Sequence, residues 1–555
     1  MTYDIPIALI RQYQIGEQDV EDPEDSLFAG SVRKWSDDHD TLPLITGRYD
    51  ESVFDRLEQI ATVLVREGCT NVKVLKLSNQ YLKKRVRYRA LIAAGDKVTL
   101  NTLNKIPTAV EGFCQQLPNQ RFFEYDDDRL VAWRLLSCKY NNSSRDNPAY
   151  VMFTFGAIRE NNEVSKKFSV YSRNIGKSKT LADLIDLFRL MPETEELNQE
   201  WLVLQEVMAT MIADKGNVYQ AEGLAQRSQS NRWSSYGGQS FQFRSGQPNE
   251  VVMDNFGYIE ESENNKSSGK QVFAMHSALT GQSENVPIHP FVGVFYLEEH
   301  VWLTCHVDSL TMYEFQGEQL LSKLVLPDSH KELISILLEM SKMSIEDIIK
   351  GKKGGSFIMS TGNPGTGKTL TAEVFAEVIK RPLYKVQCSQ LGLNVEEVEK
   401  NLKLVLMRAS RWSAILLIDE ADVYVRSRGN DIQQNAIVGV FLRTLEYYSG
   451  ILFMTSNLET EIDDAIMSRA TAHLVYEIPS DNDRLEIWSI LNEQFDVGLS
   501  TVDILSMNNT FQGIVGRDVK AILKLGLMVA KSKGRRCTVD DLIKVSKFVP
   551  NVKVI

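Results

Sequence analysis

Long uncharged apolar runs, paired cysteines and an excess of basic charge are all missing from this 555-residue sequence. No apolar stretch of about 18 residues occurs, so we expect no membrane-spanning helix. The six cysteines are scattered without a C-x-x-C pair, which weighs against a zinc or redox site and favours reduced thiols in a cytoplasmic protein. The N-terminus lacks the basic and apolar segments of a secretory signal. A net charge of −11 argues against general coating of nucleic acid, while leaving room for a local basic patch.

What the chain does contain is the composition of a globular protein, with 43% hydrophobic and 24% charged residues. Its length exceeds what one hydrophobic core supports, and roughly three or four domains are expected. The patterns divide it into an N-terminal region of helices and strands (1–120), a mostly β region (121–325), a region of alternating strands and helices (326–480) and a helical end (481–555). The alternation predicts an α/β domain whose parallel sheet is covered on both faces.

The most informative segment is GNPGTGKT at 362–369, which fits the pattern G-x-x-x-x-G-K-[ST]. Backbone N–H groups of such a loop bind phosphate oxygens, Lys368 would reach the β- and γ-phosphates, and the Thr369 hydroxyl would hold Mg²⁺. An apolar run at 356–359 precedes the loop and a helical pattern follows it, as phosphate binding requires. The predicted nucleotide-binding residues of this segment are Gly362, Asn363, Pro364, Gly365, Thr366, Gly367, Lys368, Thr369 and Leu370.

Two carboxylates follow the apolar run at 414–418. An unbroken run of this kind is typical of a strand buried on both faces, and its C-terminal end would lie beside the phosphate loop. Asp419 would hold Mg²⁺ directly or through water, and Glu420 would polarise the attacking water. The alternative, two acidic residues at a surface strand end, is the weaker interpretation in this position.

Three further polar residues are candidates that are weak when read singly. Asn457 ends another apolar run and could contact the lytic water or the γ-phosphate, although asparagine is also a common turn residue. Arg469 follows a short helical pattern, and it fits either a finger that reaches a neighbouring subunit or a surface ion pair. Arg517 begins the helical pattern 519–530, where it could report the γ-phosphate or form an ion pair at the helix start.

Together these elements resemble the AAA ATPases over roughly 327–555. The resemblance implies a RecA-like α/β domain with a small helical lid, ATP and Mg²⁺ as cofactors, and a homo-oligomeric ring, by expectation a hexamer. It assigns Lys368 and Thr369 to the Walker A motif and Asp419 and Glu420 to the Walker B motif. The remaining assignments are sensor 1 to Asn457, the arginine finger to Arg469, sensor 2 to Arg517 and adenine contact to the backbone of Ile348 or Ile349.

Two features of the sequence refine the resemblance. The segments RPLY at 381–384 and FLRTLEYY at 441–448 resemble a little-characterised group of AAA proteins common in fungi, in which a β-rich region precedes the ATPase domain. The loop at 389–395 differs from that of peptide-threading members because it has no aromatic residue, and Leu391 and Leu393 would grip a passing chain only weakly. It is similar to the loop of mitochondrial AAA translocases that move a folded protein. Threading of an unfolded chain is therefore in doubt, whereas ATP hydrolysis is expected.

The leading hypothesis is an ATP-hydrolysing ring that remodels or disassembles a macromolecular complex, with 121–325 selecting the partner because the ATPase core is generic. A nucleic-acid-linked ATPase and an ATP-dependent assembly switch or scaffold are the alternatives. The basic run at 83–89 and the Arg- and aromatic-containing segment 227–244 would carry nucleic-acid binding. A solvated charged face and a surface loop anchored by its aromatics are the favoured interpretations of these two segments.

Overall fold

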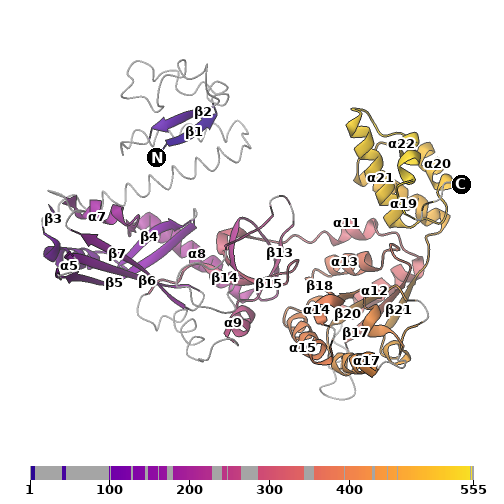
Figure 1. Cartoon of the computed structure of the whole chain (residues 1–555), viewed down its shortest axis with the longest axis horizontal. Coiled ribbons are helices and arrows are strands. Elements are labelled where there is room, and N and C mark those ends of the chain that lie inside the picture. Colours follow the sequence, from indigo (N-terminus) through magenta and orange to yellow (C-terminus); the bar gives the residue numbers. More distant parts are fainter. Residues whose placement is uncertain are drawn as a thin grey trace. The chain divides into compact units, whose positions relative to one another are not determined.

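The computed structural model describes residues 2–6, 41–45, 99–100, 102–126, 129–143, 148–159, 162–171, 179–227, 240–244, 246, 248–263, 286–342, 355–392, 394–427, 432–446, 448–458, 461–550 and 552. The chain forms two compact units, and each is described by itself (Figure 1). The first unit contains Met1–Thr210, Glu263–Val292 and His306–Asp308, and the second contains Met211–Ser262, Gly293–Cys305 and Ser309–Ile555. No helix among the described residues combines the length and the hydrophobicity needed to cross a bilayer.

The first unit is built around a five-stranded antiparallel sheet in the order β7-β6-β5-β4-β9. Phe122, Phe153 and Phe155 belong to its core, which also includes residues of the helices α5 and α7. On β4 the next residue, Phe123, contacts Trp201 of α8, because successive side chains of a strand point to opposite faces. The elements of this unit are β1 (Thr2–Pro6), β2 (Thr41–Ile45), β3 (Thr99–Leu100), η1 (Leu103–Lys105), α5 (Ile106–Cys114), β4 (Arg121–Asp126), β5 (Arg129–Asn141), β6 (Tyr150–Arg159), β7 (Asn162–Tyr171), β8 (Lys179–Thr180), α7 (Leu181–Leu187), β9 (Met191–Pro192) and α8 (Glu195–Ala213).

The second unit begins with a seven-stranded sheet in the order β12-β11-β15-β14-β13-β10-β16. The β-rich character predicted for this part of the chain is confirmed. The elements of this sheet and its connections are β10 (Val218–Ala221), β11 (Leu224–Arg227), β12 (Ser240–Gln242), β13 (Glu250–Met253), α9 (Asn255–Glu263), β14 (Phe291–Tyr296), β15 (Val301–His306), η2 (Val307–Ser309) and β16 (Leu310–Met312). The start of β14 and the residues His306–Asp308 belong to the first unit.

A five-stranded, wholly parallel sheet in the order β18-β19-β20-β17-β21 follows, as the alternating pattern predicts. Its strands are β17 (Ser356–Gly362), β18 (Leu383–Gln387), β19 (Ile415–Asp419), β20 (Ile451–Ser456) and β21 (Ala472–Tyr476). The helices around it are α11 (Gly317–Ser322), α12 (Asp328–Lys342), α13 (Lys368–Val378), α14 (Cys388–Leu391), α15 (Val395–Arg411), α16 (Asp422–Val425), α17 (Ile432–Leu445) and α18 (Asp464–Met467).

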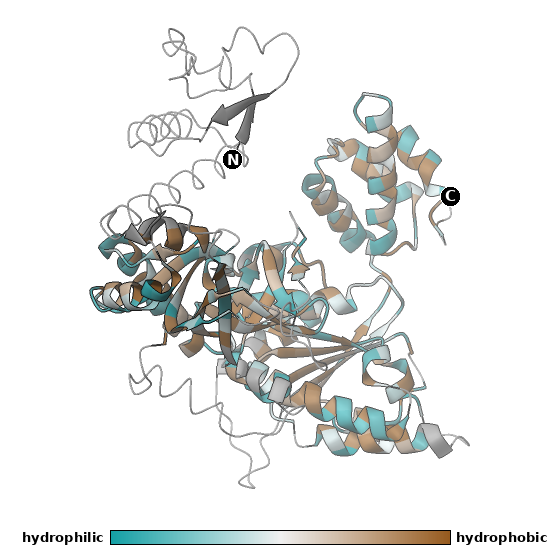
Figure 2. Cartoon of the chain, turned by 60° about the vertical axis from the view of Figure 1, so that its left-hand side comes forward, coloured by the Kyte–Doolittle hydropathy of each residue, from teal (hydrophilic) through white to brown (hydrophobic). Residues whose placement is uncertain are grey.

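The residues of β19 explain why helices cover both faces of this sheet. Ile415 and Leu417 pack with residues of α12 and α13, whereas Leu416 and Ile418 pack with residues of α15 and α17. All four side chains are fully buried, and each contributes about 1.5–3 kcal/mol relative to exposure. In Figure 2 the strands of this sheet are coloured as hydrophobic, while the helices around them carry both colours.

The seven-stranded sheet is fixed to the parallel-sheet domain through an aromatic cluster. Phe295 of β14 lies 5.0 Å from Trp412, which follows α15, and 5.7 Å from Tyr384 of β18, measured between ring centroids. The guanidinium of Arg408 lies 4.7 Å from the Phe295 centroid and pairs with Glu261 of α9. Beyond β16, Glu377 near the end of α13 accepts hydrogen bonds from Tyr313 Oη (2.9 Å) and from the backbone N–H of Gln316 (2.8 Å). The β-rich part is therefore packed against the parallel-sheet domain at two places.

The chain ends in four helices that share their own core. These are α19 (Asp481–Gln494), α20 (Thr501–Thr510), α21 (Gly516–Ser532) and α22 (Val539–Ser546). Trp488 and Phe511 are fully buried at its centre. Ser480 and Ser500 cap the first two helices by accepting hydrogen bonds from Asp483 N and Asp503 N. The helical end that the sequence predicts is thus a small helical domain.

Candidate nucleotide-binding site

The phosphate loop connects β17 to α13, in the strand, loop and helix order expected from the sequence. Gly362 has a φ of +135°, and a Cβ at this position would lie 2.1 Å from the carbonyl oxygen of Tyr476. Gly365 has a φ of +87°, and a Cβ there would lie 2.9 Å from side-chain atoms of Val515 and Arg517. Only glycine fits both conformations and both spaces, so the glycines of the motif are required by the shape of the loop.

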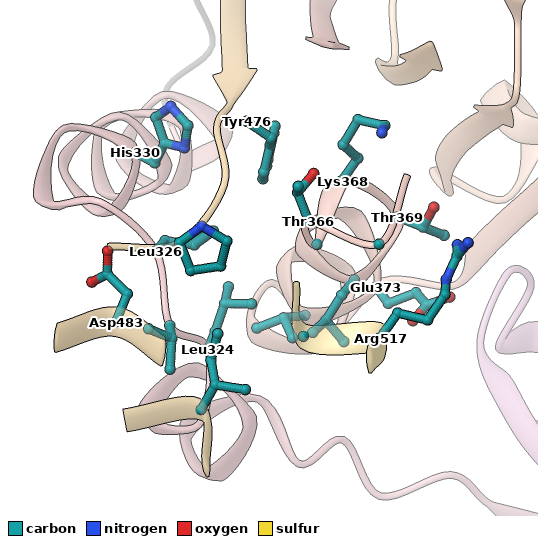
Figure 3. A pocket seen from close by; sticks show the side chains of 18 of the residues that line it. Leu324, Leu326, His330, Thr366, Lys368, Thr369, Glu373, Tyr476, Asp483 and Arg517 are labelled. Atoms are coloured by element: carbon teal, nitrogen blue, oxygen red, sulfur yellow. The ribbon is translucent and has the colours of Figure 1, made fainter. Parts of the chain in front are cut away.

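The side chain of Lys368 lies within this loop at the start of α13 (Figure 3). Its Nζ donates hydrogen bonds to the carbonyl oxygens of Gly362 (2.6 Å) and Asn363 (2.8 Å) and to Asn457 Oδ1 (3.0 Å). Burial lowers the pKa of the ammonium group. A cation with three weak neutral acceptors is well placed to exchange them for phosphate oxygens.

Asp419 at the end of β19 is surrounded by donors. Its Oδ1 accepts from Thr369 Oγ1 (2.9 Å) and Thr455 Oγ1 (2.6 Å), and its Oδ2 lies 3.0 Å from Lys385 Nζ. Burial alone would raise the pKa of Asp419, but the hydrogen bonds from Thr455 and Lys385 hold it below its ordinary value. The ionised carboxylate and the Thr369 hydroxyl are hard oxygen ligands, which fit a magnesium ion.

Glu420 and Asn457 lie at the carboxyl ends of neighbouring strands. Glu420 has a φ of +56°, a left-handed conformation that is costly for a residue with a side chain. Its backbone N–H donates to Thr455 Oγ1 at 2.9 Å, so Thr455 contacts both the Asp419 carboxylate and the Glu420 backbone. Sequence reasoning missed Thr455, although a hydroxyl inside the apolar run of β20 is the signal that could have shown it.

Arg517 enters the site from the helical end of the chain, where it begins α21. It lines one cavity together with Lys368, Thr369 and Glu420 (Figure 3). This cavity has a volume of about 1100 Å³, enough for a nucleotide. Its other wall is apolar, and the sequence did not reveal these residues because they come from three separate segments. They include Leu324, Leu326, Ile478, Ile487 and Leu491.

Other predicted residues have different positions. Ile348 and Ile349 lie outside the described residues, as does the basic run 83–89. Arg469 is absent from the lining of the cavity in its own chain, and its exposed side chain donates to the carbonyl oxygen of Ala465 at 3.1 Å. Asn363 contributes through its backbone oxygen to Lys368. The remaining residues predicted from the phosphate loop, Pro364, Thr366, Gly367 and Leu370, line the cavity.

One sequence interpretation is wrong, and another agrees with the structure. The expectation that Leu391 would weakly grip a passing chain is wrong, because this residue ends the short helix α14 and is fully buried in the core. In the described part of the segment 227–244, Arg227 and Arg244 pair with Glu299 and Glu298. Phe243 is also buried there. These residues anchor the segment to the seven-stranded sheet.

Comparison with known proteins identifies the domain that holds this site. A family model described as "ATPase family associated with various cellular activities (AAA)" matches residues 358–478. The chain is similar to "ATPase family AAA domain-containing protein FIGL1" of Arabidopsis thaliana, with 29% identity over 192 residues, 32% of this chain and 28% of the relative. It is also similar to "Mitochondrial sorting homolog" of Caenorhabditis elegans, with 26% identity over 231 residues, 40% of this chain and 65% of the relative.

Among solved structures, the chain is similar to that of the FIGL-1 AAA domain in complex with ADP. The identity is 18%, the match covers 41% of this chain and 84% of that chain, and the TM-score is 0.34. The matched segments thus amount to between about a quarter and two thirds of the length of the two curated relatives.

Proposed function

The chain carries an ATPase domain of the AAA family, and on that premise we propose that it hydrolyses Mg·ATP to remodel or disassemble a macromolecular complex. The observation that carries the proposal is the convergence of Lys368, Asp419, Glu420 and Asn457 at the carboxyl edge of one parallel sheet. This edge is where open α/β sheets bind ligands. The lysine cation, the two carboxylates and the asparagine amide at this edge are the groups that phosphoryl transfer to water requires.

Each residue has a role that follows from its chemistry. Lys368 would bind the β- and γ-phosphates, and Thr369 and Asp419 would hold Mg²⁺. When bound, the ion would neutralise charge on the phosphates. Glu420 would accept a proton from the attacking water, and Asn457 would orient that water or the γ-phosphate. The adenine would occupy the apolar wall that includes Leu324 and Leu326, because a flat uncharged base replaces water there favourably.

We propose that the working form is a homo-oligomeric ring, by expectation a hexamer. Arg469 supports this idea because it is exposed and does not line the cavity of its own chain. A cation that neutralises transition-state charge must lie near the phosphates, so Arg469 would act in the site of a neighbouring subunit. Arg517 would report the nucleotide to the helical domain in its own chain.

Remodelling, rather than hydrolysis alone, is supported by the attachment of the seven-stranded sheet. The aromatic cluster of Phe295 and Trp412 and the hydrogen bonds of Glu377 link this sheet to the elements that hold the phosphate loop. A movement of the ATPase domain would therefore reach the region that we expect to recognise the partner. Arg227 and Arg244 are already paired with glutamates, so their charges are less available for the nucleic-acid binding that a nucleic-acid-linked ATPase would need.

The decisive experiment uses Glu420→Gln, which should retain bound ATP but lose turnover. Glu396→Gln, at the start of the distant helix α15, is the matched control and should hydrolyse ATP like the parent chain. If Glu420→Gln neither traps ATP nor loses turnover, the proposed role of Glu420 is wrong. Imaging the trapped variant separates closed rings from the filaments of an assembly scaffold, and its co-purifying partners identify the complex acted upon.

A further inference from the structure

The magnesium-binding carboxylate already has a cation of the protein beside it. Lys385 Nζ lies 3.0 Å from Asp419 Oδ2, while two hydroxyls occupy Oδ1 of the same carboxylate. Both oxygens of the Asp419 carboxylate therefore already have donor partners. A divalent ion that binds Asp419 must compete with the ammonium group of Lys385 or be repelled by it.

A second carboxylate is placed to receive this lysine. Glu373 Oε1 lies 3.7 Å from Lys385 Nζ. Glu373 follows Thr369 by four residues on α13, so both project from the same face of that helix. Thr369, Asp419, Lys385 and Glu373 thus form a chain of alternating donors and acceptors along the wall of the cavity.

The backbone explains why the lysine reaches this position. Lys385 is on β18, which pairs in parallel with β19, and it lies opposite Leu417 in the register. Asp419 is two residues further along β19, on the same face of the sheet as Leu417. This face is covered by α13, and Leu383, Ile415 and Leu417 of the two strands pack there. A lysine on that face is partly shielded from water and needs a partner of opposite charge. The carboxylates of Asp419 and Glu373 supply it.

We propose that Lys385 is an internal counterion that occupies Asp419 before Mg·ATP binds, and that Glu373 is the positioning residue that takes over Lys385 when the metal arrives. The proposal rests on the function proposed above. It predicts that the two residues have opposite effects on magnesium binding. Removing Lys385 removes the competing cation, whereas removing the charge of Glu373 leaves Asp419 as the only carboxylate paired with Lys385 among the described residues.

The test is a magnesium titration of fluorescent ATP binding to the full chain in the Glu420→Gln background, so that no turnover interferes. Lys385→Met should lower the Mg²⁺ concentration at half-saturation by roughly three- to tenfold, and Glu373→Gln should raise it by a similar factor, as expected for partly exposed charges at these distances. In the double variant, the effect of Glu373→Gln should largely disappear, because the residue acts through Lys385.

The ion pair between Lys403 and Glu399 on α15 provides matched controls, since it has the same residue types and a separation of 2.7 Å. Lys403→Met and Glu399→Gln should leave the midpoint unchanged. Shifts of the same sign in the two test variants, or an equal effect of Glu373→Gln with and without Lys385, would overturn the proposal. If the parent chain binds no nucleotide even with Mg²⁺, the proposed function itself fails. Binding by the parent without the opposite shifts rejects only the role of Lys385 and Glu373.

Discussion

Trp412 Nε1 donates a hydrogen bond of 2.8 Å to Asp254 Oδ2, and this bond joins the end of α15 to the β-rich part of the second unit. Asp254 is fully buried and also accepts from the backbone N–H of Gly257 at 2.8 Å. Arg411 lies 3.4 Å away and completes the pairing of the carboxylate. The contact is therefore a buried polar network beside the aromatic cluster, and its loss would leave two buried N–H donors without their acceptor.

Asp254→Ala should lower the free energy of unfolding of the second unit by about 3 kcal/mol, because it leaves the Trp412 and Gly257 N–H groups without their acceptor and removes one of the two carboxylates that pair with Arg411. Urea unfolding followed by tryptophan fluorescence measures this. Asp126→Ala is the control, since its pair with Arg159 is half exposed on the aspartate side and should cost less than about 1 kcal/mol. Equal losses in the two variants would show that the Asp254 network adds nothing beyond a surface pair.

Lys368→Ala should weaken ATP binding by roughly 10- to 100-fold, the loss expected for hydrogen bonds between a cation and phosphate. Titration with a fluorescent nucleotide measures the change. Lys403→Ala, on the exposed face of α15, should bind like the parent chain. Unchanged affinity in Lys368→Ala would mean that nucleotide binds elsewhere.

Arg469→Ala should lose most of its turnover while still binding ATP, because its own cavity is complete without this residue. Mixing it with Glu420→Gln should restore part of the activity, since an intact Arg469 from one subunit then meets an intact Glu420 in the next. Turnover is measured across protein concentration. Arg469→Ala that equals the parent chain at every concentration would exclude a finger acting between subunits.

Glu250 should make stability depend on pH. Burial, and then the charges of Glu377 and Glu373, raise the pKa of Glu250 to about 7. The folded state therefore binds a proton that the unfolded chain releases at lower pH, so stability falls as pH rises from about 4.5 to 7. Glu250→Gln should be more stable than the parent by about 1–2 kcal/mol at pH 8 and equal to it near pH 4.5, allowing for partial exposure. Melting curves at several pH values measure this.

The exposed Glu222 supplies the control for that experiment, because Glu222→Gln should leave the pH dependence as it is in the parent chain. A pH profile that Glu250→Gln does not alter would mean that Glu250 is better solvated than its surroundings suggest.

The sequence predicts the parallel sheet, the helical end and the position of the phosphate loop because each depends on local patterns. Buried strands appear as apolar runs, and Lys368 and Thr369 belong to one contiguous motif. Lys385 and Glu373 could not be recognised in this way. Their roles depend on which strands are neighbours and on which face of the sheet α13 covers. No short sequence segment specifies either. The burial of Leu391 has the same origin, because a short helix replaced the expected loop.

Helix α13 connects the phosphate loop to the β-rich part of the second unit. Its first turn holds Lys368, and Glu377 in its last turn accepts hydrogen bonds from the segment that leaves the seven-stranded sheet. Eleven residues of helix form a stiff rod of about 16 Å. A tilt of α13 at its phosphate end would therefore also move its contact with the β-rich part. The two activities that we propose, ATP hydrolysis and partner binding, would be coupled through α13 and would not need a common surface.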